Sequence, residues 1–182
     1  MDSLDIIYQL NERDFSLVTE EDDDSDFVFV QNTHCKYFNE DQFHKSICTI
    51  SKKQFSLVHF NARSLYKNFD SICAYLMSLN YPFSLIGITE TWMNDRPDIF
   101  SLPGYTFCQS DRLSGRGGGV AFFINNKLKF RILDNINFNI DGVESLFFEI
   151  SNTKVVGVVY RKPSSSITDF TGSFENILPL RC

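Results

Sequence analysis

Hydrophobic and polar positions beyond the first 50 residues follow strand-like and helix-like periods in turn. FSLVHF (55–60) is a compact apolar run rich in strand-forming residues. Apolar residues then recur every three or four positions, which predicts one amphipathic helix over 64–80 that begins at a Ser64 cap. FSLIGIT (83–89) is apolar on both faces, as in a central strand. The unit therefore predicts two parallel strands joined by a right-handed crossover helix.

Short strand-like runs dominate the rest of the chain, and helical periodicity returns at 169–178. Their close spacing predicts antiparallel pairing, with Asn125-Asn126 and Asn152-Thr153 at tight turns. One main helix beside many strands predicts an α+β layered sandwich. Because a helix after the last strand normally leads to another strand, we expect a truncated domain with an unpaired sheet edge. The short strand-like runs that we expect to pair are 105–111, 120–125, 127–133, 143–150 and 153–160.

Charge divides the chain in two. Residues 1–50 hold 12 acidic and 3 basic side chains, whereas the remainder holds 11 acidic and 14 basic ones. Half of these acidic residues lie in EEDDDSD (20–26), and such a block repels itself and buries no apolar surface. We therefore expect 1–50 to be an acidic, largely disordered segment and 51–182 to be the folded domain. The mildly basic body permits a polyanionic partner.

Composition also indicates the setting of the protein. No apolar run approaches the roughly 20 residues of a membrane span, so we expect no membrane association. The start, MDSLDIIYQL, has no basic region and does not resemble a secretory signal. Five scattered cysteines, an odd number, favour a reducing compartment. We therefore expect an intracellular protein, nuclear or cytoplasmic.

Two polar residues follow the two predicted parallel strands. Asn61 comes after the first strand and Glu90 after the second. The carboxyl ends of parallel strands share one edge of the sheet, where open α/β sheets bind ligands. A carboxylate and a carboxamide are hard oxygen ligands suited to Mg²⁺ beside a phosphate. The alternative for Glu90 is a solvated loop residue beside Arg96.

Other candidate motifs carry weaker chemistry. RGGG (116–119) could let the backbone approach a phosphate, or it could be a turn that needs positive φ, and it lacks the Lys-Ser/Thr of a P-loop. YRK (160–162) ends a strand with a phenol that could donate to phosphate and with cations, Arg161 among them. The alternative is that Tyr160 caps the core. No serine-hydrolase elbow occurs, and the spacing of the Cys and His residues near 34–48 matches no regular zinc motif.

Five motifs in series resemble the endonuclease/exonuclease/phosphatase superfamily, and most closely the apurinic-type endonuclease domain of non-LTR retrotransposons. They are HFNARSL (59–65), TETW (89–92), PGY (103–105), DRLSGRGGGVAFFI (111–124) and VYRKP (159–163). The resemblance implies a four-layered α/β sandwich, with two facing mixed sheets and outer helices.

The resemblance also implies site residues and partners. Asn61 corresponds to an active-site Asn, Glu90 to a metal-binding Glu, and Tyr160 to a Tyr that contacts the scissile phosphate. Arg112 and Arg116 fall in a stretch associated with DNA contacts. The implied cofactor is Mg²⁺ or Mn²⁺, with no other small-molecule cofactor, and the implied partner is DNA.

The chain departs from the family pattern in its catalytic motifs. The family also uses an Asp-x-Asn motif and a later Ser-Asp-His motif, whereas this sequence has no Asp-x-Asn and no His after His59. Phosphodiester hydrolysis needs a base or metal to generate hydroxide. We therefore expect the N-terminal part of a Mg²⁺-dependent endonuclease that nicks target DNA, inactive as this isolated chain. The alternatives are a non-catalytic retrotransposon-derived remnant and a phosphatase of the same superfamily.

Overall fold

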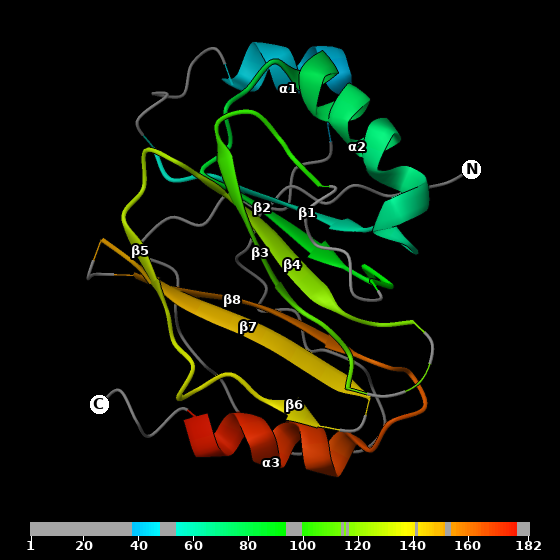
Figure 1. Ribbon diagram of the computed structural model, residues 1–182. Helices are drawn as coiled ribbons and strands as arrows, with labels where there is room; N and C mark the ends of the chain where they lie inside the picture. The colour runs from blue at the N-terminus through cyan, green and yellow to red at the C-terminus, as the bar shows by residue number, and fades with distance from the viewer. Residues whose placement is uncertain are drawn as a thin grey trace.

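The chain folds into two β-sheets that face each other between outer helices (Figure 1). The computed structural model describes residues 38–47, 54–93, 100–113, 115, 117–140, 142–151 and 154–177. This is an α+β sandwich in four layers, as expected. The helices are α1 (Glu40–Ile47), α2 (Leu65–Leu79) and α3 (Ile167–Ile177). The strands are β1 (Leu57–Asn61), β2 (Leu85–Thr89), β3 (Tyr105–Ser110), β4 (Val120–Asn125), β5 (Phe130–Ile132), β6 (Asn139–Ile140), β7 (Val143–Ile150) and β8 (Lys154–Arg161).

The first sheet has the strand order β1-β2-β4-β3. β1 and β2 are parallel, joined by α2, while β2-β4 and β4-β3 pair antiparallel, so this sheet is mixed. Every residue of β2 is buried, as its uninterrupted apolar sequence predicts for a central strand. The pairing places Asn61 opposite Thr89, so both parallel strands end at the same edge. The predicted strand–helix–strand unit is confirmed.

The second sheet corrects two expectations. β7 pairs with β8 on one side and with β5 and β6 on the other, and all of these pairs are antiparallel, so among the described strands only the first sheet is mixed. The predicted hairpin around Asn125-Asn126 is also wrong. A turn does occur there, in which the Asn125 side chain accepts the Lys127 amide at 3.1 Å, but β4 stays in the first sheet while β5 crosses to the second.

Helix α1 lies within the segment expected to be disordered, and it corrects the start of the folded body. Asn39 and Gln42 exchange hydrogen bonds between side chain and backbone at 2.9 and 3.0 Å, a reciprocal cap that begins the helix. Phe43 is then buried and stacks on Phe83, with ring centroids 6.3 Å apart. His44 Nε2 lies 2.9 Å from the Ser78 carbonyl oxygen of α2. The acidic run at 20–26 lies outside the described residues.

The apolar core has two parts, separated by the first sheet. Ile86, Ile88 and Phe123 face the helices, whereas Leu85, Phe122 and Phe148 lie between the sheets. The rings of Phe122 and Phe148 meet edge to face, with centroids 4.7 Å apart. Within the described helices, none is long and apolar enough to cross a membrane.

The two sheets are offset. β8 packs over β2 and β4, and β7 packs over β3 and β4. The edge strand of the first sheet, β1, therefore extends beyond the edge of the second sheet. The face of β1 that looks toward the second sheet, with His59 and Asn61, is therefore left at an open rim. Both residues are exposed, while Val58 and Phe60 on the opposite face of β1 are buried under the helices.

Candidate metal and phosphate site

Asn61 and Glu90 meet at the rim where β1 and β2 end. Asn61 Nδ2 donates to Glu90 Oε1 at 3.0 Å. Their proximity follows from the parallel pairing of β1 with β2, in which Asn61 lies opposite Thr89, the residue before Glu90. The structure therefore brings together the two residues that the sequence placed at one edge. Glu90 is partly exposed, which leaves its carboxylate accessible from solvent.

The backbone around Glu90 is held in an unusual conformation. Glu90 and Trp92 have φ values of 54° and 51°, in the left-handed region that non-glycine residues adopt only rarely. Neighbouring amides fix this turn, because Ser64 N donates to the Glu90 carbonyl at 2.9 Å and Leu65 N to the Thr91 carbonyl at 2.9 Å. The start of α2 thus lends its amide groups to the turn that presents the Glu90 side chain.

This arrangement corrects the expected role of Ser64. Ser64 occupies the N-cap position of α2, but its side chain makes no capping hydrogen bond and its φ is 92°. The amide of the next residue, which a helix start leaves without an intrahelical acceptor, finds one in the Thr91 carbonyl instead. The start of the helix was predicted correctly, whereas its capping mechanism was not.

Tyr160 joins the pair from the second sheet. Its phenol lies close enough to Glu90 for the carboxylate to affect its pKa. Burial raises the pKa of the Tyr160 phenol, the negative charge and hydrogen bond of Glu90 raise it further, and the Arg112 guanidinium opposes the shift. Tyr160 is therefore a neutral hydrogen-bond donor at physiological pH. A donor of this kind, beside a carboxylate and a carboxamide, suits an anionic oxygen such as that of a phosphate.

The three arginines predicted to contact DNA or phosphate lie in different surroundings. Arg112 forms an ion pair with Glu144, with 2.6 Å between Nε and Oε1, and only 10% of its side chain is exposed. The Arg161 guanidinium donates to the Ser165 carbonyl at 2.9 Å and thereby holds the turn before α3. Arg116 lies outside the described residues. Neither described arginine has its guanidinium free of protein partners.

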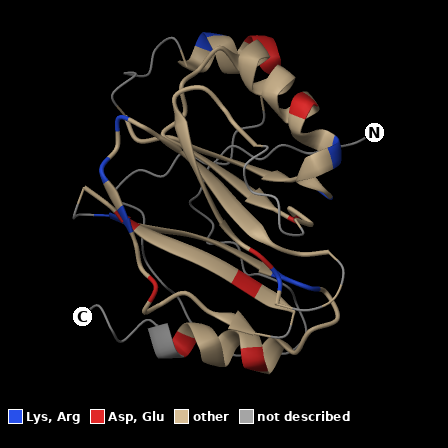
Figure 2. Ribbon diagram, viewed as in Figure 1, with Lys and Arg blue, Asp and Glu red and all other residues tan. Residues whose placement is uncertain are grey.

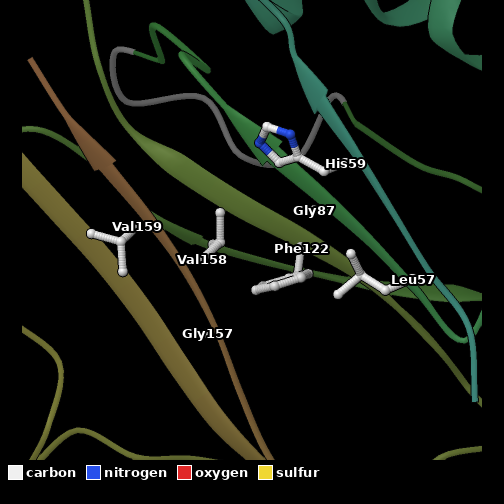
Figure 3. A pocket seen from close by; sticks show the side chains of 7 residues that line it. All are labelled: Leu57, His59, Gly87, Phe122, Gly157, Val158 and Val159. Carbon is white, nitrogen blue, oxygen red and sulfur yellow. The ribbon is translucent and has the colours of Figure 1, made fainter. Parts of the chain in front are cut away.

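A pocket of about 260 Å³ lies between the sheets, next to the rim (Figure 3). Leu57 and His59 line it from β1, Phe122 from β4 and Val158 from β8, and β2 contributes Gly87. His59 Nε2 lies 3.1 Å from Thr89 Oγ1, and burial of the ring lowers the pKa of His59 although the residue keeps an exposed edge. His59 is the ionisable side chain of this lining, and Asn61, Glu90 and Tyr160 do not line the pocket.

Glu144 on β7 is a residue that the sequence analysis missed. It shares a strand face with Leu146, Phe148 and Ile150, all of which are buried in the core between the sheets. A Glu in step with three apolar residues at a spacing of two is the signal that could have revealed it. Glu144 itself is fully buried. Figure 2 shows this acidic segment of β7 beside the basic segment that follows β3.

The donor set at the rim fits a divalent cation that keeps most of its water. Within the described residues no three His, Cys, Asp or Glu side chains come together as metal ligands, so a cation here would have Glu90 as its carboxylate ligand, with the Asn61 amide beside it. Mg²⁺ commonly binds proteins through one or two carboxylates and completes its shell with water and substrate phosphate. The rim is therefore compatible with Mg²⁺ or Mn²⁺, whose remaining coordination positions water and phosphate would fill.

Comparisons with known proteins find a likeness in structure but none in sequence. No family model matches the chain, and no curated protein matches it significantly. Among solved structures, the chain is similar to the endonuclease domain of TRAS1, a telomere-specific non-LTR retrotransposon, with 10% identity and a TM-score of 0.45. That similarity covers 71% of this chain and 54% of the other, so the chain spans about half the length of that domain. The α+β class rests on the chain's own sheets and helices.

Proposed function

We propose that the rim formed by Asn61, Glu90 and Tyr160 is part of the active site of a DNA endonuclease that depends on Mg²⁺ or Mn²⁺. The observation that carries the proposal is the 3.0 Å hydrogen bond between Asn61 and Glu90 at the carboxyl ends of two parallel strands. Ligands of open α/β sheets bind at such an edge. The resemblance of the surrounding motifs to the retrotransposon endonucleases supports DNA as the substrate and an intracellular location, nuclear or cytoplasmic.

Each residue has a distinct role in this proposal. Glu90 holds the cation through its carboxylate, and Asn61, whose amide nitrogen donates to that carboxylate, keeps it oriented. The Tyr160 hydroxyl, neutral and near Glu90, is the donor for a phosphate oxygen. A bound Mg²⁺ or Mn²⁺ supplies neutralisation of phosphate charge and acidifies a coordinated water.

The proposal includes the absence of turnover by the 182-residue chain alone. The described residues offer Glu90 but no cluster of three His, Cys, Asp or Glu that could also activate water. Hydrolysis needs a general base or a second activating group in addition to charge neutralisation. We therefore expect the 182-residue chain to bind both the cation and DNA but not to cleave the DNA.

Cation binding tests the proposal directly. Mn²⁺ is titrated into the 182-residue chain and followed by electron paramagnetic resonance, with Glu90→Gln as the test variant. Glu149→Gln is the matched control, because Glu149 is also a strand carboxylate but pairs with the exposed Arg131 in the second sheet. We expect Mn²⁺ binding to be lost in Glu90→Gln and kept in Glu149→Gln. Equal binding by both variants would refute the cation site.

Cleavage distinguishes the alternatives. Supercoiled plasmid incubated with Mg²⁺ and the 182-residue chain should stay intact, and metal-dependent nicking would overturn the expected inactivity. A longer chain in which a segment with the Asp-x-Asn and Ser-Asp-His motifs follows these residues should nick the plasmid, and Glu90→Gln should abolish that nicking. If the longer chain bound DNA without cleaving it, the result would favour a non-catalytic remnant. Release of phosphate from a small phosphoester, without nicking, would favour a phosphatase.

A further inference from the structure

Glu144 carries a charge that has no exposed surface. Its Oε1 lies 2.6 Å from Arg112 Nε, and its Oε2 accepts from Arg112 Nη2 at 3.3 Å and from the Gly119 amide at 3.1 Å. A buried carboxylate is strongly destabilising unless charges and hydrogen bonds compensate it. Here a cation and a backbone amide satisfy both oxygens. The carboxylate therefore fixes two groups at once.

Arg112 and Gly119 both lie in the connection between two strands of the first sheet. Glu144 lies on β7, whereas Arg112 follows β3 and Gly119 precedes β4. The contact ties both ends of the β3–β4 connection to the second sheet, close to the rim. At Gly118, which has a φ of 74°, a Cβ atom would overlap the Arg112 guanidinium. The guanidinium thus packs directly against the glycine backbone, and the connection is held on two sides.

The glycine backbone in turn holds the residues that follow Glu90. Thr91 N donates to the Gly119 carbonyl at 3.3 Å, and Trp92 N donates to the Gly118 carbonyl at 2.9 Å. The same Gly119 that gives its amide to Glu144 therefore gives its carbonyl to Thr91. Gly119 alone therefore links the buried Glu144 carboxylate to the Thr91 amide, which follows Glu90 directly.

A second route runs through side chains. Arg112 Cζ lies 5.8 Å from the centroid of the Tyr160 ring, within the range of a cation–π contact, and the Tyr160 phenol is close enough to Glu90 for the carboxylate to raise its pKa. Glu144 thus reaches Glu90 through the glycine backbone and also through Arg112 and Tyr160. The first route ends on the backbone that follows Glu90, and the second ends beside the Glu90 carboxylate.

We propose that Glu144 is a positioning residue that holds the β3–β4 connection and Arg112, and thereby fixes the turn at Glu90–Trp92. The identity of the ligand at Glu90 rests on the proposed function, whereas the positioning role of Glu144 rests on the contacts described above. It assigns Arg112 a structural partner in the protein in place of a DNA phosphate. The backbone φ of 54° at Glu90, which needs support from neighbouring groups, is the feature that the anchor stabilises.

Trp92 makes the proposal measurable, because it is the only tryptophan in the chain. Its emission maximum and its quenching by acrylamide report the position of the turn without any cation or DNA. The test variants are Glu144→Gln and the double substitution Arg112→Met with Glu144→Met, which removes both buried charges together. Glu149→Gln on the same strand is the matched control.

We expect both Glu144 variants to shift the Trp92 emission to longer wavelength and to raise its quenching constant, with no change in the control. Mn²⁺ affinity should fall by about 10- to 100-fold, as for other residues that orient metal ligands. Unchanged Trp92 quenching in a folded double variant would overturn the positioning role. If wild-type protein bound no Mn²⁺ while Trp92 still responded, the proposed function would fail and the positioning role would stand.

Hydrogen exchange of the wild-type protein covers the case in which neither variant folds. The amides of Gly119, Thr91 and Trp92 should exchange slowly, near the rate of the buried amides of β7, because each donates a hydrogen bond in the anchored turn. Rapid exchange at these three amides, with β7 protected, would overturn the proposal without any substitution.

Discussion

Replacing Gly119 with alanine should destabilise the fold strongly. Gly119 has a φ of 82°, and a non-glycine residue in the left-handed region is disfavoured by about 1–2 kcal/mol. The added Cβ would also overlap the hydroxyl oxygen of Thr91, which is fully buried and has no open space to move into. Overpacking of this kind adds about 1–3 kcal/mol. The two effects together predict a loss of about 2–5 kcal/mol.

Two further variants separate the contributions. Gly104→Ala is the matched control, because Gly104 has a φ of 86° but nothing within 4 Å of the added Cβ, so only the backbone effect of about 1–2 kcal/mol applies. Combining Gly119→Ala with Thr91→Ala removes the overlap. The double variant should therefore be more stable than the sum of the single effects by about 1–3 kcal/mol, the coupling typical of residues in contact.

Urea unfolding followed by circular dichroism measures the wild type, the single variants Gly119→Ala, Gly104→Ala and Thr91→Ala, and the double variant. Circular dichroism is preferable to fluorescence here because Trp92 lies in the perturbed turn. The reasoning would be refuted if Gly119→Ala were no less stable than Gly104→Ala, or if the Thr91 and Gly119 substitutions were simply additive. Either result would mean that the connection relaxes freely and does not press on Thr91.

Three other substitutions test the packing and the charges. Tyr105→Phe removes the hydrogen bond from the hydroxyl to the Phe83 carbonyl at 2.8 Å, at about 0.5–1.5 kcal/mol near neutral pH. Burial raises the pKa of Tyr105 above its usual 10.0, so wild-type protein should lose stability as pH rises through 10 and this variant less steeply. Phe122→Ala should remove about 3–5 kcal/mol from the core between the sheets. Glu149→Gln breaks only an exposed pair and should change stability by less than about 1 kcal/mol.

Controls for these substitutions come from the same chain. Tyr66 is 75% exposed, so Tyr66→Phe should alter neither the urea midpoint nor its dependence on pH. An alkaline profile of Tyr105→Phe that matched wild type would assign the loss above pH 10 to another group. A change below 1 kcal/mol in Phe122→Ala would contradict the close packing of the two sheets. A large effect of Glu149→Gln would disqualify it as the control for Glu90 and Glu144.

The sequence predicted the parts of the fold whose periodicity is uninterrupted. The apolar stripe of α2 and the continuous apolar run of β2 led to the parallel pair, and that pair placed Asn61 beside Glu90. Helix α1 was missed because its acidic surroundings concealed a short helix that depends on one capping pair and on Phe43. The path of β5 was also missed, because a tight turn fixes a change of direction but not the sheet to which the next strand belongs.

The candidate site divides in the same way. The sequence motifs single out Asn61, Glu90 and Tyr160, and the structure brings all three together. Glu144 could not be placed from motifs, because its importance depends on a partner 32 positions away that belongs to the other sheet. The roles of the glycines were likewise open, and the structure gives Gly117, Gly118 and Gly119 positive φ values of 86°, 74° and 82°, as the turn interpretation required.

The offset between the sheets has a consequence for ionic strength. Glu90 lies at the uncovered margin, where dissolved salt penetrates and screens charge over about 8 Å at physiological concentration. Glu144 lies under the covered part of the sandwich, where no dissolved ion reaches its carboxylate. Added sodium chloride should therefore weaken attraction between Glu90 and any approaching cation, yet leave the Arg112–Glu144 bond nearly untouched. Two carboxylates that both act on Tyr160 should therefore differ in their response to salt, strong at Glu90 and nearly absent at Glu144.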